Sequence, residues 1–193
     1  MIKIVFKMKN RKSNRLRNYD YSRNNLYFVT ICVQDRICCL GSINVRKGRN
    51  PFSNSNRDLS PSPNEPTQKT TNLNPYGTIV EDRIKWLEDQ YKYVVIRNYV
   101  VMPNHVHLIL QIDNQRLKDE DVKIKSLSSL IGAFKTTSSK AIHESGFLKF
   151  TWQRSFYDHI IKNDKSYKNI SNYIDANPDK WHQDMFYFDN KTT

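Results

Sequence analysis

The sequence predicts an α+β domain with a mainly antiparallel sheet and with helices packed mainly on one face of that sheet. Three observations lead to this fold class. The length of 193 residues suits one domain of ordinary size. The patterns along the chain follow the order strand, long loop, helix, strand, strand, helix, strand, helix. The second and third strands are separated only by a tight turn, so they form an antiparallel hairpin.

The strands are predicted from β-branched and aromatic content. The first is expected at residues 27–34, where Tyr27 and every second residue after it share one face. Two more, at 93–102 and 105–112, are joined by a Pro-Asn turn. One further strand, or two short ones, is expected within 147–162.

Apolar residues spaced three and four apart predict helices at 76–91, 126–144 and 165–177. From about residue 46 to residue 75, Asn, Ser, Pro and Thr dominate, and such a segment cannot bury enough surface to offset its ordering entropy. We therefore expect a polar, flexible loop there, inserted in a single domain that spans 25–185. A basic arm at 1–24 precedes this domain, and a tail at 186–193 follows it.

The formal net charge of +12 favours a polyanionic partner, of which nucleic acid is the usual one. Basic residues are concentrated before the first strand and are interleaved with Tyr19 and Tyr21. This pattern favours an arm that contacts phosphates, although a solvated arm that aids solubility has the same composition. The residues of the arm that we expect to bind DNA are Arg11, Arg15, Arg17, Tyr19 and Tyr21.

The three cysteines, Cys32, Cys38 and Cys39, are odd in number and include an adjacent pair, so they predict no disulfide framework. The opening apolar run is too short for a signal peptide, and no run approaches membrane-spanning length. We expect a protein of the reducing cytoplasm.

Two histidines, His105 and His107, begin the strand at 105–112. Side chains two apart in a strand point to the same face, so both imidazoles project together while Val106 points to the other face. Neutral imidazole is the commonest protein metal ligand, and the pair therefore indicates a metal site. A structural zinc site and an ordinary polar sheet surface remain alternatives.

Tyr173 and Asn177 are four residues apart on the last predicted helix and so share one face of it. An asparagine carbonyl suits a loosely held ion such as magnesium or manganese. A nearby cation would stabilise the phenolate of Tyr173 and polarise a phosphate oxygen. These parts describe attack of a tyrosine on a phosphodiester. A surface pair or a helix cap is the alternative for this spacing, and packing is the favoured role of Tyr157 and His159.

Five ordered pieces of the chain resemble one known family. They are residues 15–21 (RLRNYDY), 27–30 (YFVT), 101–107 (VMPNHVH), 152–161 (WQRSFYDHII) and 173–178 (YIDANP). The sequence resembles the REP-associated tyrosine transposases, a branch of the HUH single-strand nucleases related to the smallest insertion-sequence transposases. The resemblance runs from about residue 11 to the end, interrupted by the polar segment.

The resemblance implies an RRM-like, ferredoxin-like sheet and a metal-dependent enzyme of DNA transposition and recombination. Such an enzyme cleaves and rejoins single-stranded DNA, often at hairpin-forming repeats, through a 5′-phosphotyrosine, and acts at the nucleoid. Carried over to this chain, His105 and His107 bind Mg²⁺ or Mn²⁺ with Asn177, and Tyr173 is the nucleophile. Tyr157 is the alternative nucleophile. Arg154 and Lys162 join the DNA-contacting residues, with Lys162 standing where many relatives have Arg.

Two other functions remain open. A non-catalytic module could bind single strands through phosphate charge and base stacking. A zinc hydrolase is less favoured, because the sequence offers no further ligand at zinc spacing beside the histidine pair. The sequence leaves the choice between monomer and dimer open.

Overall fold

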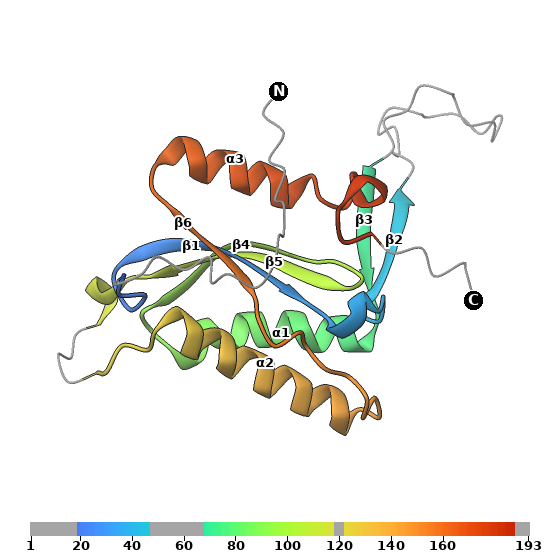
Figure 1. The fold of residues 1–193 in the computed structure, drawn as a ribbon, viewed down its shortest axis with the longest axis horizontal. Helices are drawn as coiled ribbons and strands as arrows, with labels where there is room; N and C mark the ends of the chain where they lie inside the picture. Colours follow the sequence, from blue (N-terminus) through green and yellow to red (C-terminus); the bar gives the residue numbers. More distant parts are fainter. Residues whose placement is uncertain (1–18, 47–67, 118–121, 188–193) are drawn as a thin grey trace, which may run out of the picture.

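The computed structural model describes residues 19–46, 68–117 and 122–187 (Figure 1). The helices and strands are β1 (Asn25–Cys32), β2 (Gly41–Arg46), β3 (Gln68–Leu73), α1 (Pro75–Gln90), β4 (Val94–Val101), β5 (His105–Ile112), α2 (Leu127–Glu144), β6 (Tyr157–Ile161) and α3 (Asp164–Asp175). The predicted α+β class is confirmed. In the described part of the chain, every helix is too short or too polar to cross a membrane.

The main sheet has the strand order β4-β5-β1-β6, and all its neighbours are antiparallel. The predicted hairpin is confirmed, since Val101 pairs with Val106 across the turn between β4 and β5. On the other side of β5, His105 pairs with Cys32 and His107 pairs with Thr30 of β1. The histidine pair therefore lies in the centre of the sheet, at the hairpin end of β5.

Helices α1 and α2 lie side by side on one face of this sheet (Figure 1). Their apolar stripes meet the alternate residues of β1 and β5, which form the larger core. Those strand residues are Tyr27, Val29, Ile31, Val106, Leu108 and Leu110. The predicted alternation is confirmed in both strands, because Tyr27, Val29 and Ile31 share one face of β1, and Val106, Leu108 and Leu110 point away from the histidines in β5.

Helix α3 lies on the opposite face of the sheet (Figure 1). Its buried residues Ile170 and Ile174 pack against Phe28, Ile109 and Ile161, which form a smaller core. The helices are thus divided two to one between the faces. The histidines share the face of Ile109, so α3 is the helix that covers them.

Strands β2 and β3 form a separate two-stranded ribbon. The expected polar loop is wrong at its carboxyl end, because residues 68–73 are a strand rather than a loop. Strand β3 consists mainly of polar residues, so no apolar alternation marks it, whereas Ile43 and Val45 of β2 do alternate with polar residues and were overlooked. Lys69 N–H also donates to Asp179, just beyond α3 (2.6 Å). Residues 47–67, the rest of the expected loop, lie outside the described residues.

Residues on the outer side of both expected domain limits contact the folded domain. Tyr19 and Tyr21, assigned to the arm, pack against the larger core. Phe186, assigned to the tail, is buried. Both ends of the described chain therefore belong to the folded domain.

The start of helix α1 packs closely against Leu40, in the loop before β2. Asn74 caps the helix by accepting from Gly77 N–H, and its own N–H donates to Leu40 O (3.2 Å). Leu40 N–H in turn donates to Pro103 O (3.0 Å), within the turn that leads to the histidines. A Cβ at position 77 would overlap the Leu40 carbonyl.

We expect Gly77→Ala to lower the free energy of unfolding by about 1–3 kcal/mol, because α1 must shift away from Leu40. Gly132→Ala in α2 is the matched control, since a Cβ there meets no atom within 4 Å. It should raise stability by about 0.5–1 kcal/mol through helix propensity. Urea unfolding of both variants measures the difference, and equal effects would contradict this account of the α1 start.

Candidate metal and nucleophile site

The two imidazoles are enclosed on the α3 face of the sheet, where His105 is 0% and His107 is 1% exposed. The Phe186 ring packs against His105 at a centroid distance of 4.7 Å, and Trp181 lies 6.0 Å from the same ring. Phe28 stacks on His107 from within the sheet (5.4 Å). A polar pair in such a dry setting requires partners for every nitrogen.

Asn104 determines which ring nitrogen of neutral His105 carries the proton. Its Nδ2 donates to the carbonyls of Arg36 (3.0 Å) and Phe186 (2.8 Å), so its Oδ1 must face the ring of His105. That oxygen lies 2.9 Å from His105 Nδ1 and can only accept. Neutral His105 therefore carries its proton on Nδ1 and presents the lone pair of Nε2.

His107 has two partners of its own. Its Nδ1 lies 2.8 Å from the hydroxyl of Thr30, which can accept from it or donate to it. Its Nε2 lies 3.3 Å from the Tyr173 hydroxyl. With Thr30 as acceptor, the lone pair of His107 Nε2 faces the phenol.

The two Nε2 atoms lie 3.0 Å apart. This separation is about that of adjacent ligands around an octahedral ion with bonds of about 2.1 Å. Ligating histidines also typically donate their second N–H to a fixed acceptor, as His105 does to Asn104. The pair therefore fits a divalent metal, and a structural role for the polar surface explains the convergence less well.

Burial keeps both imidazoles neutral. It lowers the pKa of His107 to about 3. Burial also lowers the pKa of His105, with smaller effects from the charges of His107 and Arg36. Metal binding requires neutral imidazole, and the site therefore holds both rings ready to ligate at neutral pH.

Helix α3 carries Tyr173 to this pair. Asn163 caps the helix at its start, and Asn98 of β4 donates to Ser171 Oγ and Asp175 Oδ1, both at 2.8 Å. A bulge between Ile96 and Asn98 shifts the register of β4 at this point. Bulges re-aim side chains, and this one accompanies the contact that holds α3 over the sheet.

The phenol of Tyr173 is partly buried and protonated. Burial is the largest cause that raises its pKa, and the charge of Asp184 raises it further, while a hydrogen bond with Asn177 lowers it. A cation beside the oxygen would act in the opposite direction to burial.

Asn177 lies just after α3 and is buried, with 2% of its surface exposed. Its Nδ2 donates to Asp184 Oδ2 (3.0 Å), whereas its Oδ1 is buried with no hydrogen-bond partner among the described residues. An unsatisfied buried carbonyl oxygen is costly in a folded protein, and an absent ligand is one explanation for it.

Asp184 is the residue that the sequence analysis missed. One oxygen of its carboxylate and one nitrogen from each histidine all lie within 4.8 Å of one another. Burial raises the pKa of this carboxyl, while hydrogen bonds from Phe186 N–H and Asn177 lower it. It follows a short 3-10 turn (Trp181–Gln183), where no periodicity marks it. The flanking aromatic residues Trp181 and Phe186 were the available signal.

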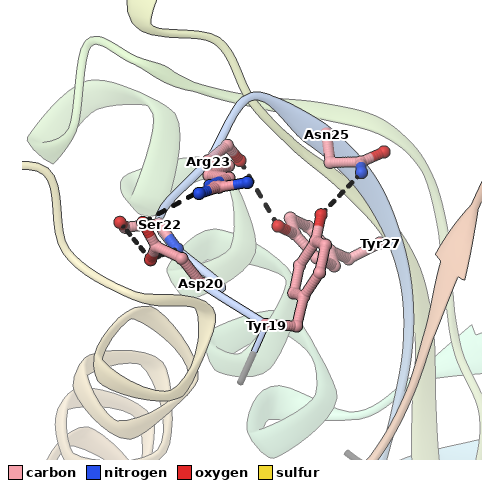
Figure 2. Close-up of polar contacts among 6 residues, drawn as sticks. All are labelled: Tyr19, Asp20, Ser22, Arg23, Asn25 and Tyr27. Atoms are coloured by element: carbon pink, nitrogen blue, oxygen red, sulfur yellow. Dashed lines mark hydrogen bonds and ion pairs between the residues drawn. The ribbon is translucent and has the colours of Figure 1, made fainter. Parts of the chain in front are cut away.

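The basic arm is described only at its carboxyl end, and Arg11, Arg15 and Arg17 lie outside the described residues. Tyr19 accepts a hydrogen bond from Asn25 (2.7 Å), as Figure 2 shows. The ring of Tyr19 also meets the ring of Tyr21 edge-on. Asn25 pairs with Ile112, at the end of the sheet opposite to the histidines. The two tyrosines are therefore well apart from the metal site.

The other candidates lie along β6 and its flanks. Tyr157 pairs with Thr30 and packs edge-on against Phe28, on the strand beyond β1 as seen from His107. Arg154 and Lys162 are both exposed, one before β6 and one after it. Tyr173, whose hydroxyl meets His107, is thus the better placed of the two tyrosines.

Comparisons with known proteins agree with this geometry. A family model described as "Transposase IS200 like" matches residues 74–177. A Haemophilus influenzae protein described as uncharacterized is 29% identical over 192 residues, covering 93% of this chain and 94% of that protein. A second protein of that organism, named "Putative REP-associated tyrosine transposase", is 25% identical over 168 residues, covering 83% of this chain and 74% of its own.

Among solved structures, a REP-associated tyrosine transposase bound to a REP hairpin matches with a TM-score of 0.50 and 21% identity. The match covers 87% of this chain and 74% of that one. It shows the same fold, and with the family match it confirms the resemblance seen in the sequence.

The buried histidines give stability a defined dependence on pH. Their pKa values are lower in the folded chain than the ordinary 6.5, so the unfolded chain binds more protons below that pH. Without metal, we expect the free energy of unfolding to fall as pH drops from 7 to 5, by as much as about 2 kcal/mol for each histidine.

Urea unfolding in EDTA at pH 7 and pH 5 measures this loss. His107→Gln should lose less stability than the wild type over the same interval, because it removes one of the two groups. His159→Gln, which changes an exposed histidine of β6, is the control and should behave as the wild type. Equal losses in all three proteins would contradict the pKa directions of the buried pair.

Proposed function

Because this chain belongs to the family of IS200-like transposases, we propose that it is a metal-dependent single-stranded DNA transesterase. It cleaves and rejoins DNA through a 5′-phosphotyrosine on Tyr173. The observation that carries this proposal is the 3.3 Å contact between the Tyr173 hydroxyl and His107 Nε2. That contact brings the phenol of Tyr173 to a neutral imidazole pair with the separation expected of metal ligands.

In this proposal, His105, His107 and Asn177 hold Mg²⁺ or Mn²⁺. The Oδ1 of Asn177 supports its inclusion, since it is a buried hard ligand atom that has no hydrogen-bond partner among the described residues. The bound ion would polarise a phosphate oxygen and offset the charge that develops in the transition state. Asn104 and Thr30 hold the two rings in orientation, and Phe186 and Trp181 keep water from them.

The covalent step belongs to Tyr173. Its Oη forms a bond to phosphorus while the bond from phosphorus to the 3′ oxygen breaks. The phenol proton leaves to solvent, and the departing 3′ oxygen takes up a proton. Attack by a 3′-hydroxyl on the phosphotyrosine reverses these changes and rejoins the strand. The bond energy is conserved at each step, so no nucleotide is consumed.

The substrate is proposed to be single-stranded DNA, and in particular a hairpin-forming repeat. The net charge of +12 supports a polyanionic ligand. The structural relative was solved with a REP hairpin. We propose that the basic arm with Tyr19 and Tyr21, together with Arg154 and Lys162, contacts this DNA.

Tyr173→Phe should abolish covalent attachment to DNA, because it removes the attacking oxygen and little else. Incubation with labelled hairpin DNA and Mn²⁺, followed by denaturing electrophoresis, measures the adduct. Tyr157→Phe is the matched control and should retain the adduct. An adduct with Tyr173→Phe that disappears in Tyr157→Phe would instead make Tyr157 the nucleophile.

His105→Ala should eliminate cleavage at every concentration of Mg²⁺ or Mn²⁺, while DNA binding in EDTA stays within about twofold of wild type. The histidine serves the metal, whereas phosphate contacts depend on basic residues. Gel-shift and cleavage assays on the same samples separate the two effects. If the wild type binds DNA but leaves it uncut with either metal, the chain is a non-catalytic binding module.

A further inference from the structure

We propose that Asp184 is the anionic ligand of the metal site, and that Asn177 positions its carboxylate. The inference rests on the proposed metal of the transesterase and extends the ligand set beyond the family match, which ends at residue 177. The juxtaposition that carries it is the convergence of one Asp184 oxygen with the nitrogens of His105 and His107 within 4.8 Å.

The chemistry of the donors favours a carboxylate. His105, His107 and Asn177 are all neutral ligands, and together they would bring a doubly charged ion into a buried site without any compensating charge. Mg²⁺ and Mn²⁺ prefer oxygen ligands and are held chiefly by carboxylates. Within the described residues, Asp184 is the acidic side chain that converges with both histidines.

The carboxylate is held on both of its oxygens. Phe186 N–H donates to Oδ1 (2.7 Å), and Asn177 Nδ2 donates to Oδ2 (3.0 Å). An ionised carboxylate has about four lone-pair sites, so these two bonds leave room for a cation. Hydrogen bonds to ligating carboxylates are typical of built metal sites.

The segment that carries Asp184 is fastened to the histidines themselves. Phe186 O accepts from Asn104, the residue that sets the His105 tautomer, and the Phe186 ring packs on His105. Arg36 donates to Met185 O (3.0 Å) from the loop after β1. The carboxylate is therefore fixed relative to the imidazoles through short contacts on either side of it.

The hydrogen bond with Asp184 also sets the orientation of the Asn177 amide. Because its Nδ2 donates to Asp184, the amide is oriented, and its Oδ1, which has no hydrogen-bond partner within residues 19–46, 68–117 and 122–187, is left to ligate a metal. Asp184 thus ligates directly and also determines which atom of Asn177 is available.

The test is metal binding by the full-length protein without DNA, measured by titration calorimetry with Mn²⁺ and, separately, Zn²⁺. Asp184→Asn keeps an acceptor for Phe186 and removes the charge. We expect Asp184→Asn to weaken Mn²⁺ binding at least tenfold. The loss of Zn²⁺ binding should be several-fold smaller than the loss of Mn²⁺ binding, because imidazole ligands on their own suit zinc. Asp184→Ala should weaken Mn²⁺ binding at least as much.

Asp179→Asn is the matched control, since it removes one negative charge from an exposed site five residues away. It should bind Mn²⁺ as the wild type does. Unchanged Mn²⁺ affinity in both Asp184 variants would overturn the proposal. So would equal losses for Mn²⁺ and Zn²⁺ accompanied by a lower Tm of the metal-free protein, because that result describes a structural role.

The covalent assay keeps the two proposals apart. If the wild type forms no DNA adduct while Asp184→Asn selectively weakens Mn²⁺ binding, the transesterase proposal is refuted and Asp184 is supported as a metal ligand. An adduct together with unchanged metal binding by the variants does the reverse.

Discussion

The site depends on two imidazole nitrogens, on His105 and His107, that face each other at 3.0 Å in a setting without water-exposed surface. Each ring has a partner at Nδ1, so both Nε2 atoms are directed at one small volume. When His107 carries its proton on Nε2, the two nitrogens form a hydrogen bond, and when Thr30 accepts from His107 Nδ1, two lone pairs face a position that a cation can fill. The strand alternation, the covering helix and the segment after it all serve to create this volume and to enclose it.

The residues around that volume come from segments far apart in the sequence. Thr30 lies on β1, the histidines lie on β5, and Tyr173 lies on α3. The α3 helix is attached through a small apolar cluster and the polar contacts of Asn98, whereas the histidines are anchored in the sheet between β1 and the hairpin. The proposed nucleophile and the two histidines are therefore carried by different parts of the fold.

Much of the site could be predicted because it obeys short-range geometry. His105 and His107 share a face by strand periodicity, and Tyr173 and Asn177 share one by helical periodicity. Such rules link neighbours in sequence, and the family resemblance then joined the two pairs. Asp184 follows no such rule, because its approach to His105 depends on how an irregular segment folds back.

In the fold, too, most elements with apolar periodicity could be predicted and most other segments could not. The sheet and its helices were marked by apolar periodicity, whereas β3 consists mainly of polar residues and is held by backbone pairing with β2. Phe186 was assigned to a tail because the aromatic residues around it follow no helix or strand periodicity. Its burial is a property of the histidine face that receives it.

Asn104 connects three parts of this molecule through a single amide. It binds the loop after β1 through Arg36, the ring of His105, and the final segment through Phe186. An amide has no charge to gain or lose in the physiological range, unlike a carboxylate in the same place. The amide that orients the first imidazole therefore keeps the same hydrogen-bonding groups at every physiological pH.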